Sequence, residues 1–245
     1  MASQPIYLLA TGPLPEELIE EAAAKGIALD TVDFIAIEMV IDAEMGARIK
    51  ELGGRQLTAV FTSTNAVEAV KGLMNADAPA GAPDWRIFCI EGATHRAVAD
   101  YFGEATIAGT AESATALAKE MTREGAVAGE KEIFFFCGDQ RREELPAMLR
   151  AEGFKVNEWI VYRTLLTPRK TERDYAGISF FSPSAVESYF SLNMVAEGVT
   201  LFAIGRTTAA AIQARCPNAV IISDRPGKDI LIRTMTDHFQ TNNKE

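Results

Sequence analysis

The sequence predicts an α/β protein with two similar lobes, each a parallel sheet flanked by helices. Three observations support this prediction. The chain has 245 residues, of which 48% are hydrophobic, so there is enough apolar material for two separate cores. Short apolar, β-prone runs alternate with stretches of helical spacing, which is the pattern of parallel sheets crossed over by helices. Several segments also occur twice.

The repeated segments indicate that the lobes share one plan. Each copy follows an apolar run and opens a stretch with helical spacing, and the order and spacing of the copies are kept. The pairs are TSTNAVEA (Thr62 to Ala69) with FSPSAVES (Phe181 to Ser188), IEGATHRAV (Ile90 to Val98) with IGRTTAAAI (Ile204 to Ile212), and SATALAKEM (Ser113 to Met121) with GKDILIRTM (Gly227 to Met235).

A fourth pair leaves the grouping of the lobes open. The segments from Glu16 and from Glu143 both read as an amphipathic helix, a Gly stop and a strand. Two tandem copies fit this order. Another grouping fits too: the strands at 32–38 and 158–164 are two crossings, with one lobe inserted between them and the other built from both chain ends. The residues alone favour neither grouping.

Composition restricts the class of partner. The chain has 24 Lys+Arg against 34 Asp+Glu, a net charge of −10, and no basic run, which argues against nucleic acid and anionic membranes. The start has no basic region of a signal peptide, and no apolar stretch is long enough for a membrane span. We therefore expect a cytoplasmic protein that acts on a small molecule.

The cysteines and histidines argue against a metal centre. Cys89 and Cys137 lie inside apolar runs that read as buried strands, which suits free thiols in a reducing compartment. His95 and His238 are far apart, and no CxxC or HExxH motif is present. The P-loop, GxGxxG and GxSxG signatures are also absent from the sequence.

Polar turns after the predicted strands carry the candidate chemistry. Thr62 and Ser63 follow one strand, and Ser182 and Ser184 follow another. Taken singly, such residues more often only cap a helix. Several helix N-termini rimmed with Ser and Thr would together bind carboxylates or phosphates through backbone N–H groups.

Charged and aromatic residues add weaker candidates. Asp139, Arg141 and Arg142 follow a strongly apolar strand, where a solvated helix start of mixed charge is an equal interpretation. Tyr162 lies in a predicted strand, and its position alone would be explained by packing.

The combination of segments resembles a known family. VFTSTNAVEAV, FFFCGDQRREELPAMLRAEGFKVNEWIVYRT, ISFFSPSAVESYF and LFAIGRTTAAAI are similar, in order and spacing, to the uroporphyrinogen-III synthases over nearly the whole chain. That resemblance implies two α/β lobes joined by a two-stranded connector. It favours the insertion: residues 1–36 and 163–245 form one discontinuous lobe, and residues 37–162 form the inserted lobe.

The resemblance also implies an activity. Enzymes of this family close hydroxymethylbilane into uroporphyrinogen III in haem biosynthesis, with inversion of ring D, loss of water and no cofactor. Tyr162 matches the tyrosine usually proposed as the acid in the family's VYxT segment. The substrate carries carboxylates on every pyrrole ring, so we expect a cleft that is locally neutral or positive. The expected binding residues are Thr62, Ser63, Thr94, Arg141, Ser182, Ser184, Arg206, Thr207 and Thr208, with Arg142 as a further candidate.

One departure from the family pattern concerns Thr94. The family usually has Gly at the position of Glu91, and a carboxylate there would repel a propionate unless it points away.

A second hypothesis is a non-catalytic, two-lobed binding or regulatory module on the same scaffold, because fold does not determine function. No exposed apolar repeat indicates an obligate interface, so we expect a monomer.

Overall fold

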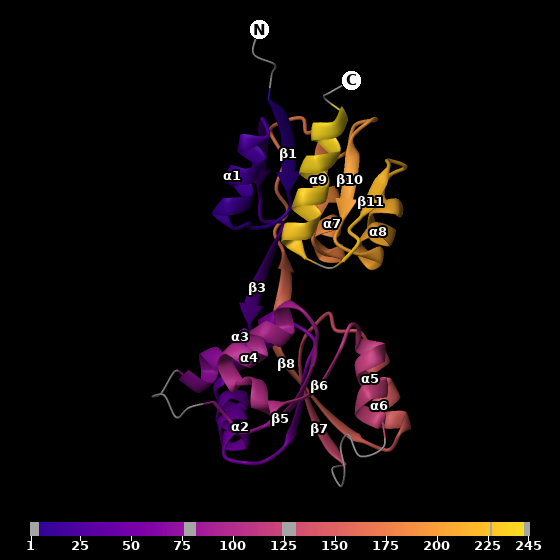
Figure 1. The fold of residues 1–245 in the computed structure, drawn as a ribbon. Coiled ribbons are helices and arrows are strands. Elements are labelled where there is room, and N and C mark those ends of the chain that lie inside the picture. Colours follow the sequence, from indigo (N-terminus) through magenta and orange to yellow (C-terminus); the bar gives the residue numbers. More distant parts are fainter. Residues whose placement is uncertain (1–4, 76–81, 124–130, 226, 243–245) are drawn as a thin grey trace. The chain divides into compact units, whose positions relative to one another are not determined.

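The computed structural model describes residues 5–75, 82–123, 131–225 and 227–242 (Figure 1). The chain divides into two compact units: unit 1 comprises residues 1–36 and 165–245, and unit 2 comprises residues 37–164. The chain passes between the units within β3 (Ile35–Met39) and within β8 (Lys155–Leu166), which are neighbours in one sheet. The second passage follows residue 164.

Unit 1 is a five-stranded sheet with helices on both faces. The strand order is β11-β10-β9-β1-β2, and each neighbouring pair is parallel. Side chains alternate between the two faces along each strand, as in β1, where Leu8 and Ala10 pack with α1 and α9, and Leu9 packs with α7 and α8. The elements are β1 (Ile6–Ala10), α1 (Glu16–Ala24), β2 (Ile27–Thr31), β9 (Gly177–Phe180), α7 (Pro183–Phe190), β10 (Thr200–Ala203), α8 (Arg206–Gln213), β11 (Val220–Ile222) and α9 (Lys228–Asn242).

Unit 2 repeats this plan with a six-stranded sheet, in the order β3-β8-β7-β4-β5-β6. The pairs from β8 to β6 are parallel. One face packs against α2, α3 and α4, and the other against α5 and α6, which lie side by side (Figure 1). The elements are α2 (Ala43–Gly53), β4 (Thr58–Phe61), α3 (Thr64–Asn75), β5 (Arg86–Ile90), α4 (Ala93–Phe102), the 3₁₀ turn η1 (Glu104–Thr106), β6 (Ile107–Ala111), α5 (Ala114–Thr122), β7 (Glu132–Gly138) and α6 (Glu144–Ala151).

The predicted α/β class, with two helix-flanked sheets of mostly parallel strands, is therefore confirmed. The two predicted Gly stops are confirmed as well. Gly26 follows α1 with φ of 74°, and Gly153 follows α6 with φ of 85°, a region that residues with a side chain rarely adopt. Cys89 and Cys137 are buried in β5 and β7, as their apolar surroundings predicted. In the described part of the chain, no helix has both the length and the apolar character needed to span a membrane.

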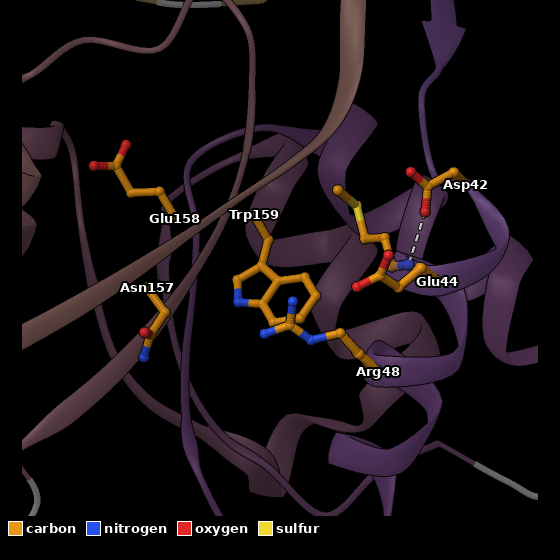
Figure 2. Close-up of a pocket in the computed structure, with 7 residues that line it drawn as sticks. Asp42, Glu44, Arg48, Asn157, Glu158 and Trp159 are labelled. Atoms are coloured by element: carbon orange, nitrogen blue, oxygen red, sulfur yellow. Dashed lines mark hydrogen bonds between the residues drawn. The ribbon is translucent and has the colours of Figure 1, made fainter.

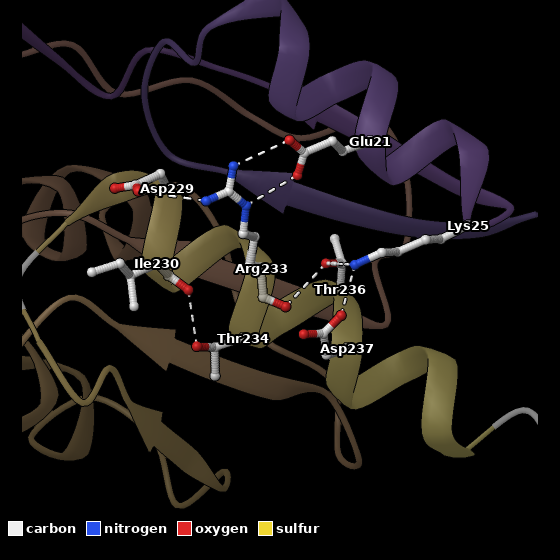
Figure 3. A network of polar contacts seen from close by, with 8 residues as sticks. All are labelled: Glu21, Lys25, Asp229, Ile230, Arg233, Thr234, Thr236 and Asp237. Carbon is white, nitrogen blue, oxygen red and sulfur yellow. Dashed lines mark hydrogen bonds and ion pairs between the residues drawn. The ribbon is translucent and has the colours of Figure 1, made fainter.

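Polar contacts join the two chain ends within unit 1 (Figure 3). The Arg233 guanidinium on α9 makes two hydrogen bonds to the Glu21 carboxylate on α1, at 3.0 and 3.1 Å. Lys25 Nζ lies 2.6 Å from Asp237 Oδ1 farther along the same two helices. Because these pairs are exposed, they contribute little to stability, and the apolar packing of α1 and α9 on the sheet holds the two ends together.

Each sheet contains one switch point, a pair of neighbouring strands from which the chain winds in opposite directions. In unit 1 the chain proceeds from β1 to β2 on one side and from β9 to β10 and β11 on the other, so the switch point lies between β1 and β9. In unit 2 it lies between β4 and β7. Open α/β sheets bind ligands outside the carboxyl ends of the strands at such a point.

Candidate functional site

A pair of hydroxyl groups lies at the switch point of unit 2. Ser63 follows β4 at the carboxyl edge of the sheet, and Tyr162 lies on β8. The Tyr162 hydroxyl donates a hydrogen bond to Ser63 Oγ across 2.9 Å, and the Asn65 backbone N–H donates to the same oxygen at 3.2 Å. Ser63 therefore holds the Tyr162 hydroxyl at the start of α3. We call these two residues the Tyr162–Ser63 hydroxyl pair.

Gly138 makes room for the Tyr162 ring. β7, which ends at Gly138, lies between β8 and β4, so Tyr162 must reach across its end to meet Ser63. A Cβ atom at Gly138 would lie 2.4 Å from Tyr162 Cζ and 2.8 Å from its hydroxyl oxygen. The register between β7 and β8 also shifts at Cys137/Gly138, which brings Tyr162 opposite Gly138. A glycine is required here because any side chain would occupy the place of the ring.

Asp139 holds the backbone of β8 at Tyr162 and directly after it. Its N–H donates to the Tyr162 carbonyl at 3.2 Å, and its Oδ1 accepts a hydrogen bond from the Thr164 N–H at 3.1 Å. These two bonds connect the end of β7 to β8 beyond the shift in register. Asp139 therefore positions Tyr162 and also places an exposed carboxylate at the same edge of the sheet.

Burial raises the pKa of Tyr162 above the ordinary value for a phenol. Hydrogen bonds with the side chains of Ser63 and Asn65 oppose this shift, and the nearby Cys137 thiol and Asp139 carboxylate add to it. The phenol therefore remains protonated at neutral pH and is available as a proton donor.

Arg141, a predicted binding residue, takes part in an ion-pair network. Its Nε donates to Glu158 Oε2, and its Nη2 lies 3.3 Å from Glu143. Arg150 on α6 also donates to Glu158 and contacts Glu143 at 3.0 Å. The Glu158 side chain is only 14% exposed. Burial alone would raise its pKa, but the bonds from the two arginines outweigh that effect and lower it. The Arg141 charge is thus already matched by carboxylates.

The two other predicted residues of unit 2 differ in accessibility. Thr62 is half-buried directly after β4. Thr94 is only 7% exposed on α4, so its hydroxyl offers little surface to a ligand. Glu91 is exposed just before the helix, and Gly92, with φ of 84°, turns the chain between them. Thr62 and Ser63 therefore lie at the same edge of the sheet as Tyr162, whereas Thr94 is almost fully buried.

The predicted residues of unit 1 lie at the carboxyl edge of its sheet, after β9 and β10. Ser182 caps α7, since its Oγ accepts a hydrogen bond from the Ala185 N–H at 3.1 Å, and Ser184 is half-buried in the first turn. After β10, Arg206 and Thr207 are exposed at the start of α8, whereas Thr208 is only 3% exposed. Helix capping, the alternative weighed for these serines, accounts for the bond seen at Ser182.

Sequence reasoning missed three residues: Gly138 and Lys228 at the carboxyl edges, and Glu158, which lies on β8 opposite Phe135 in the middle of β7. A glycine at the end of an apolar run before a charged segment was a weak signal for Gly138. No signal pointed to Glu158, because its partners come from the β7–α6 connection and from α6. Lys228 differs from its counterpart in the repeat, Ala114, and this difference was visible in the aligned segments.

A cavity of about 470 Å³ lies elsewhere in unit 2, between α2 and β8 (Figure 2). The Arg48 guanidinium lies over the Trp159 indole, 5.1 Å from the ring centroid. Asn157 and Trp159 pair with Phe134 and Phe136 in the middle of β7, away from its carboxyl end. Because three carboxylates, those of Asp42, Glu44 and Glu158, line this cavity, it is unfavourable for a polyanion. Within the described residues, no three His, Cys, Asp or Glu side chains gather as metal ligands would.

Comparison with known proteins agrees with the fold. A family model described as uroporphyrinogen-III synthase HemD matches residues 16–233. The chain belongs to the uroporphyrinogen-III synthase family. This confirms the predicted resemblance and the assignment to an enzyme family of haem biosynthesis. The comparison with curated protein sequences finds no match.

Solved uroporphyrinogen-III synthases share the fold at low sequence identity. A mutant enzyme from Thermus thermophilus superposes with a TM-score of 0.65 at 17% identity, covering 98% of this chain and 100% of that chain. The enzyme from Helicobacter pylori gives a TM-score of 0.65 at 14% identity, covering 95% and 99%. The chain therefore spans the family fold over almost its entire length.

Proposed function

We propose that the chain cyclises hydroxymethylbilane to uroporphyrinogen III with inversion of ring D, and that the Tyr162–Ser63 hydroxyl pair serves the step that expels water. The observation that carries this proposal is the 2.9 Å hydrogen bond of the pair at the switch point of unit 2. A proton donor at the carboxyl edge of an open α/β sheet lies where ligands of such sheets bind. Family membership supports the reaction itself.

In this proposal Tyr162 is the general acid. The departing hydroxyl group of the bilane must gain a proton, because hydroxide is a poor leaving group. The Tyr162 phenol is protonated at neutral pH and turns its hydrogen from Ser63 Oγ to the leaving oxygen. Departure of water leaves an azafulvenium cation. The substituted α-carbon of ring D attacks this cation to give a spiro intermediate, and the bond from that carbon to the methylene bridge of ring C then breaks. The bridge carbon bonds to the other α-carbon of ring D, which loses its proton to the Tyr162 phenolate.

Ser63 stabilises the phenolate that forms. A serine hydroxyl has one hydrogen and two lone pairs, and in the resting state Tyr162 and the Asn65 N–H donate to its oxygen. Once Tyr162 has lost its proton, the Ser63 hydrogen turns to the phenolate oxygen. Ser63 lowers the pKa of Tyr162 for the same reason, because its hydrogen bond stabilises the deprotonated form.

The Asp139 carboxylate favours the cationic intermediate. Its negative charge acts on the Tyr162 phenol, since it contributes to the raised pKa of that group. The same charge lowers the energy of a cation that develops beside the phenol. Geometry then decides the product, because the spontaneous closure of the bilane gives the uninverted isomer and the enzyme must hold ring D in the inverted position.

Binding of the substrate carboxylates is proposed for the carboxyl edges of both sheets. Arg206 and Thr207 are exposed at the start of α8, and Ser182 and Ser184 begin α7. Thr62 and Ser63 fill the corresponding place before α3. Backbone N–H groups at helix starts and a few cations bind carboxylates without a positive net charge on the protein. We propose that none of these steps requires a metal or an organic cofactor.

We propose further that the protein is a cytoplasmic monomer that does not bind nucleic acid. The net charge of −10 supports the last point, because nucleic-acid binding rests on a basic surface. Light scattering during gel filtration measures the mass directly, and a mass of about twice 26.6 kDa would contradict the monomer.

The decisive experiment supplies the purified protein with freshly made hydroxymethylbilane and resolves the oxidised products by chromatography. Uroporphyrinogen III (isomer III) should be the main product and should form faster than product forms in a control sample without protein. Production of only the uninverted uroporphyrinogen I (isomer I), at the spontaneous rate, would contradict the enzyme function. Tight binding of the bilane without isomer III would instead favour the binding or regulatory module.

A further inference from the structure

Lys228 lies at the switch point of unit 1. It is the first residue of α9, and its Nζ donates a hydrogen bond to the Pro13 carbonyl at 3.0 Å. The same ammonium lies 4.9 Å from the ring centroid of Phe181. Pro13 belongs to the segment after β1, and Phe181 directly follows β9. Lys228 therefore spans the carboxyl ends of the two strands between which the winding of the chain reverses.

The ammonium group keeps hydrogen-bonding capacity for a ligand. A lysine has three N–H donors, and the Pro13 carbonyl takes one of them. Among the described residues no carboxylate forms an ion pair with Lys228. The neighbouring Gly12 has no side chain to cover the group; a Cβ there would lie 3.9 Å from Nζ. The bond to Pro13 therefore uses one N–H donor of Lys228, and the other two can serve a ligand at this edge.

The repeat shows that the fold does not need a lysine here. The aligned segments SATALAKEM and GKDILIRTM place Ala114 opposite Lys228. In unit 2, Ser113 caps the equivalent helix α5 by accepting a hydrogen bond from the Ala116 N–H. A positive charge in the first turn of a helix is also electrostatically unfavourable. Lys228 thus reduces the stability of α9 slightly, which points to a role other than folding.

The environment of the ammonium supports anion binding. Removal of water by neighbouring atoms lowers the pKa of Lys228, and the charge of Asp33 opposes that shift. A cation that has lost part of its hydration binds a carboxylate at a smaller desolvation cost. Ser182, a predicted binding residue, directly follows Phe181, so Lys228 shares this edge with it.

We propose that Lys228 binds a carboxylate of the tetrapyrrole substrate at the switch point of unit 1. This inference rests on the proposed function and adds a residue to its binding set. Lys228 lies at the switch point of the unit 1 sheet, and the Tyr162–Ser63 hydroxyl pair lies at the switch point of the unit 2 sheet. The two equivalent edges then have different tasks: proton transfer in unit 2 and charge neutralisation in unit 1. A polyanionic substrate thereby meets a local cation on a protein of net charge −10.

The test compares Lys228→Met and Lys228→Gln with wild type. Two quantities are measured: KM for hydroxymethylbilane, and the dissociation constant for uroporphyrin III, followed by fluorescence without turnover. Both should rise about tenfold, which corresponds to the loss of one charge-assisted hydrogen bond. The kcat and the ratio of isomers should stay near their wild-type values, and Lys228→Arg should recover most of the affinity.

Lys25→Met is the matched control. It removes the same charge from unit 1 at the far end of α1, where Lys25 pairs with Asp237, and should leave both constants unchanged. Unchanged constants in Lys228→Met and Lys228→Gln would overturn the inference while isomer III is still formed. If the wild type forms isomer I alone, the proposed function fails, and the uroporphyrin measurement still decides whether Lys228 binds a polycarboxylate. Thermal unfolding of each variant separates a loss of affinity from a loss of folding.

Discussion

The Tyr162 hydroxyl donates a hydrogen bond to Ser63 Oγ across 2.9 Å, and the two residues are 99 positions apart in the sequence. This bond forms because β7 and β4 lie side by side and because β7 ends in a glycine over which the ring passes. The arrangement holds a buried phenol in contact with a second hydroxyl group at the carboxyl edge of one sheet.

Replacing Tyr162 by Phe should reduce kcat by roughly 10²- to 10⁴-fold, the usual contribution of a general acid, with little change in KM. The measurement is the initial rate of isomer III formation. Tyr101→Phe is the control, because it removes a phenol hydroxyl from α4 in the same unit, where that group contacts Asn75 at 3.4 Å. An unchanged rate in Tyr162→Phe would remove this residue from the mechanism.

Replacing Ser63 by Ala should raise the pKa of Tyr162 further, because the side-chain hydrogen bond that lowers it is lost. The phenolate is then less stable, so kcat should fall by about fivefold to tenfold, in line with roughly 1 kcal/mol for one hydrogen bond. NMR titration of ¹³C-labelled tyrosine follows the pKa, with Tyr162→Phe used to assign the signal.

Ser113→Ala is the control for loss of a helix cap, since Ser113 accepts the Ala116 N–H at the start of α5. It should lower stability by about 1 kcal/mol without moving the tyrosine titration. A titration of Tyr162 that stays in place in Ser63→Ala would contradict the hydrogen bond between them.

Replacing Gly138 by Ala should displace the Tyr162 ring, because the new Cβ would lie 2.4 Å from Cζ. We expect a large loss of kcat together with about 1–3 kcal/mol of lost stability. Gly72→Ala is the matched control: it lies in α3, where a Cβ meets nothing within 4 Å, and should stabilise the protein by about 1 kcal/mol. Wild-type turnover in Gly138→Ala would show that the ring position is unimportant.

Replacing Glu158 by Gln should lower the free energy of unfolding at neutral pH by about 1 kcal/mol, since two arginines lose their shared carboxylate. The pH dependence of this stabilisation follows from the pKa of Glu158, which is lowered from its unperturbed value of 4.5. A carboxyl group with a depressed pKa in the folded state stabilises above 4.5, and this contribution disappears as pH falls through the folded-state pKa.

The difference in the free energy of unfolding between Glu158→Gln and wild type, measured by denaturant unfolding, should therefore disappear in acid. Glu68→Gln is the control, because Glu68 forms an exposed pair with Lys71 on α3 and should change stability little at any pH. A gap that persists at the lowest pH would mean that ionisation of Glu158 is not the cause.

Much of the fold could be predicted from local pattern. The buried strands β4, β5, β7 and β9 are short apolar runs, and the helices after them show apolar residues on one face. Gly26 and Gly153 mark helix ends because few other residues adopt a positive φ. The repeat of TSTNAVEA in FSPSAVES then predicts two copies of one plan, since similar segments fold alike.

The individual side chains at the sheet edges were less predictable. Thr94 and Thr208 occupy turns that read as binding sites, yet both are almost fully buried, because each lies on the side of its helix that faces the sheet. Arg141 was predicted to bind the substrate, whereas its guanidinium contacts Glu158 and Glu143. Nothing in the spacing of these residues along the chain indicates such contacts.

The sequence by itself therefore determined the class of fold and the repeated plan, because these depend on periodicity and on residues close together in the chain. The family followed from the resemblance of whole segments, and the role of Tyr162 as the acid is implied by that resemblance and stays a proposal. Only the tertiary structure decided which residues meet. The bond between Tyr162 and Ser63 and the place of Lys228 between Pro13 and Phe181 depend on strand order and register. Both are set by packing between segments far apart in sequence, where the hydrophobic cores of the two sheets decide which strand ends become neighbours.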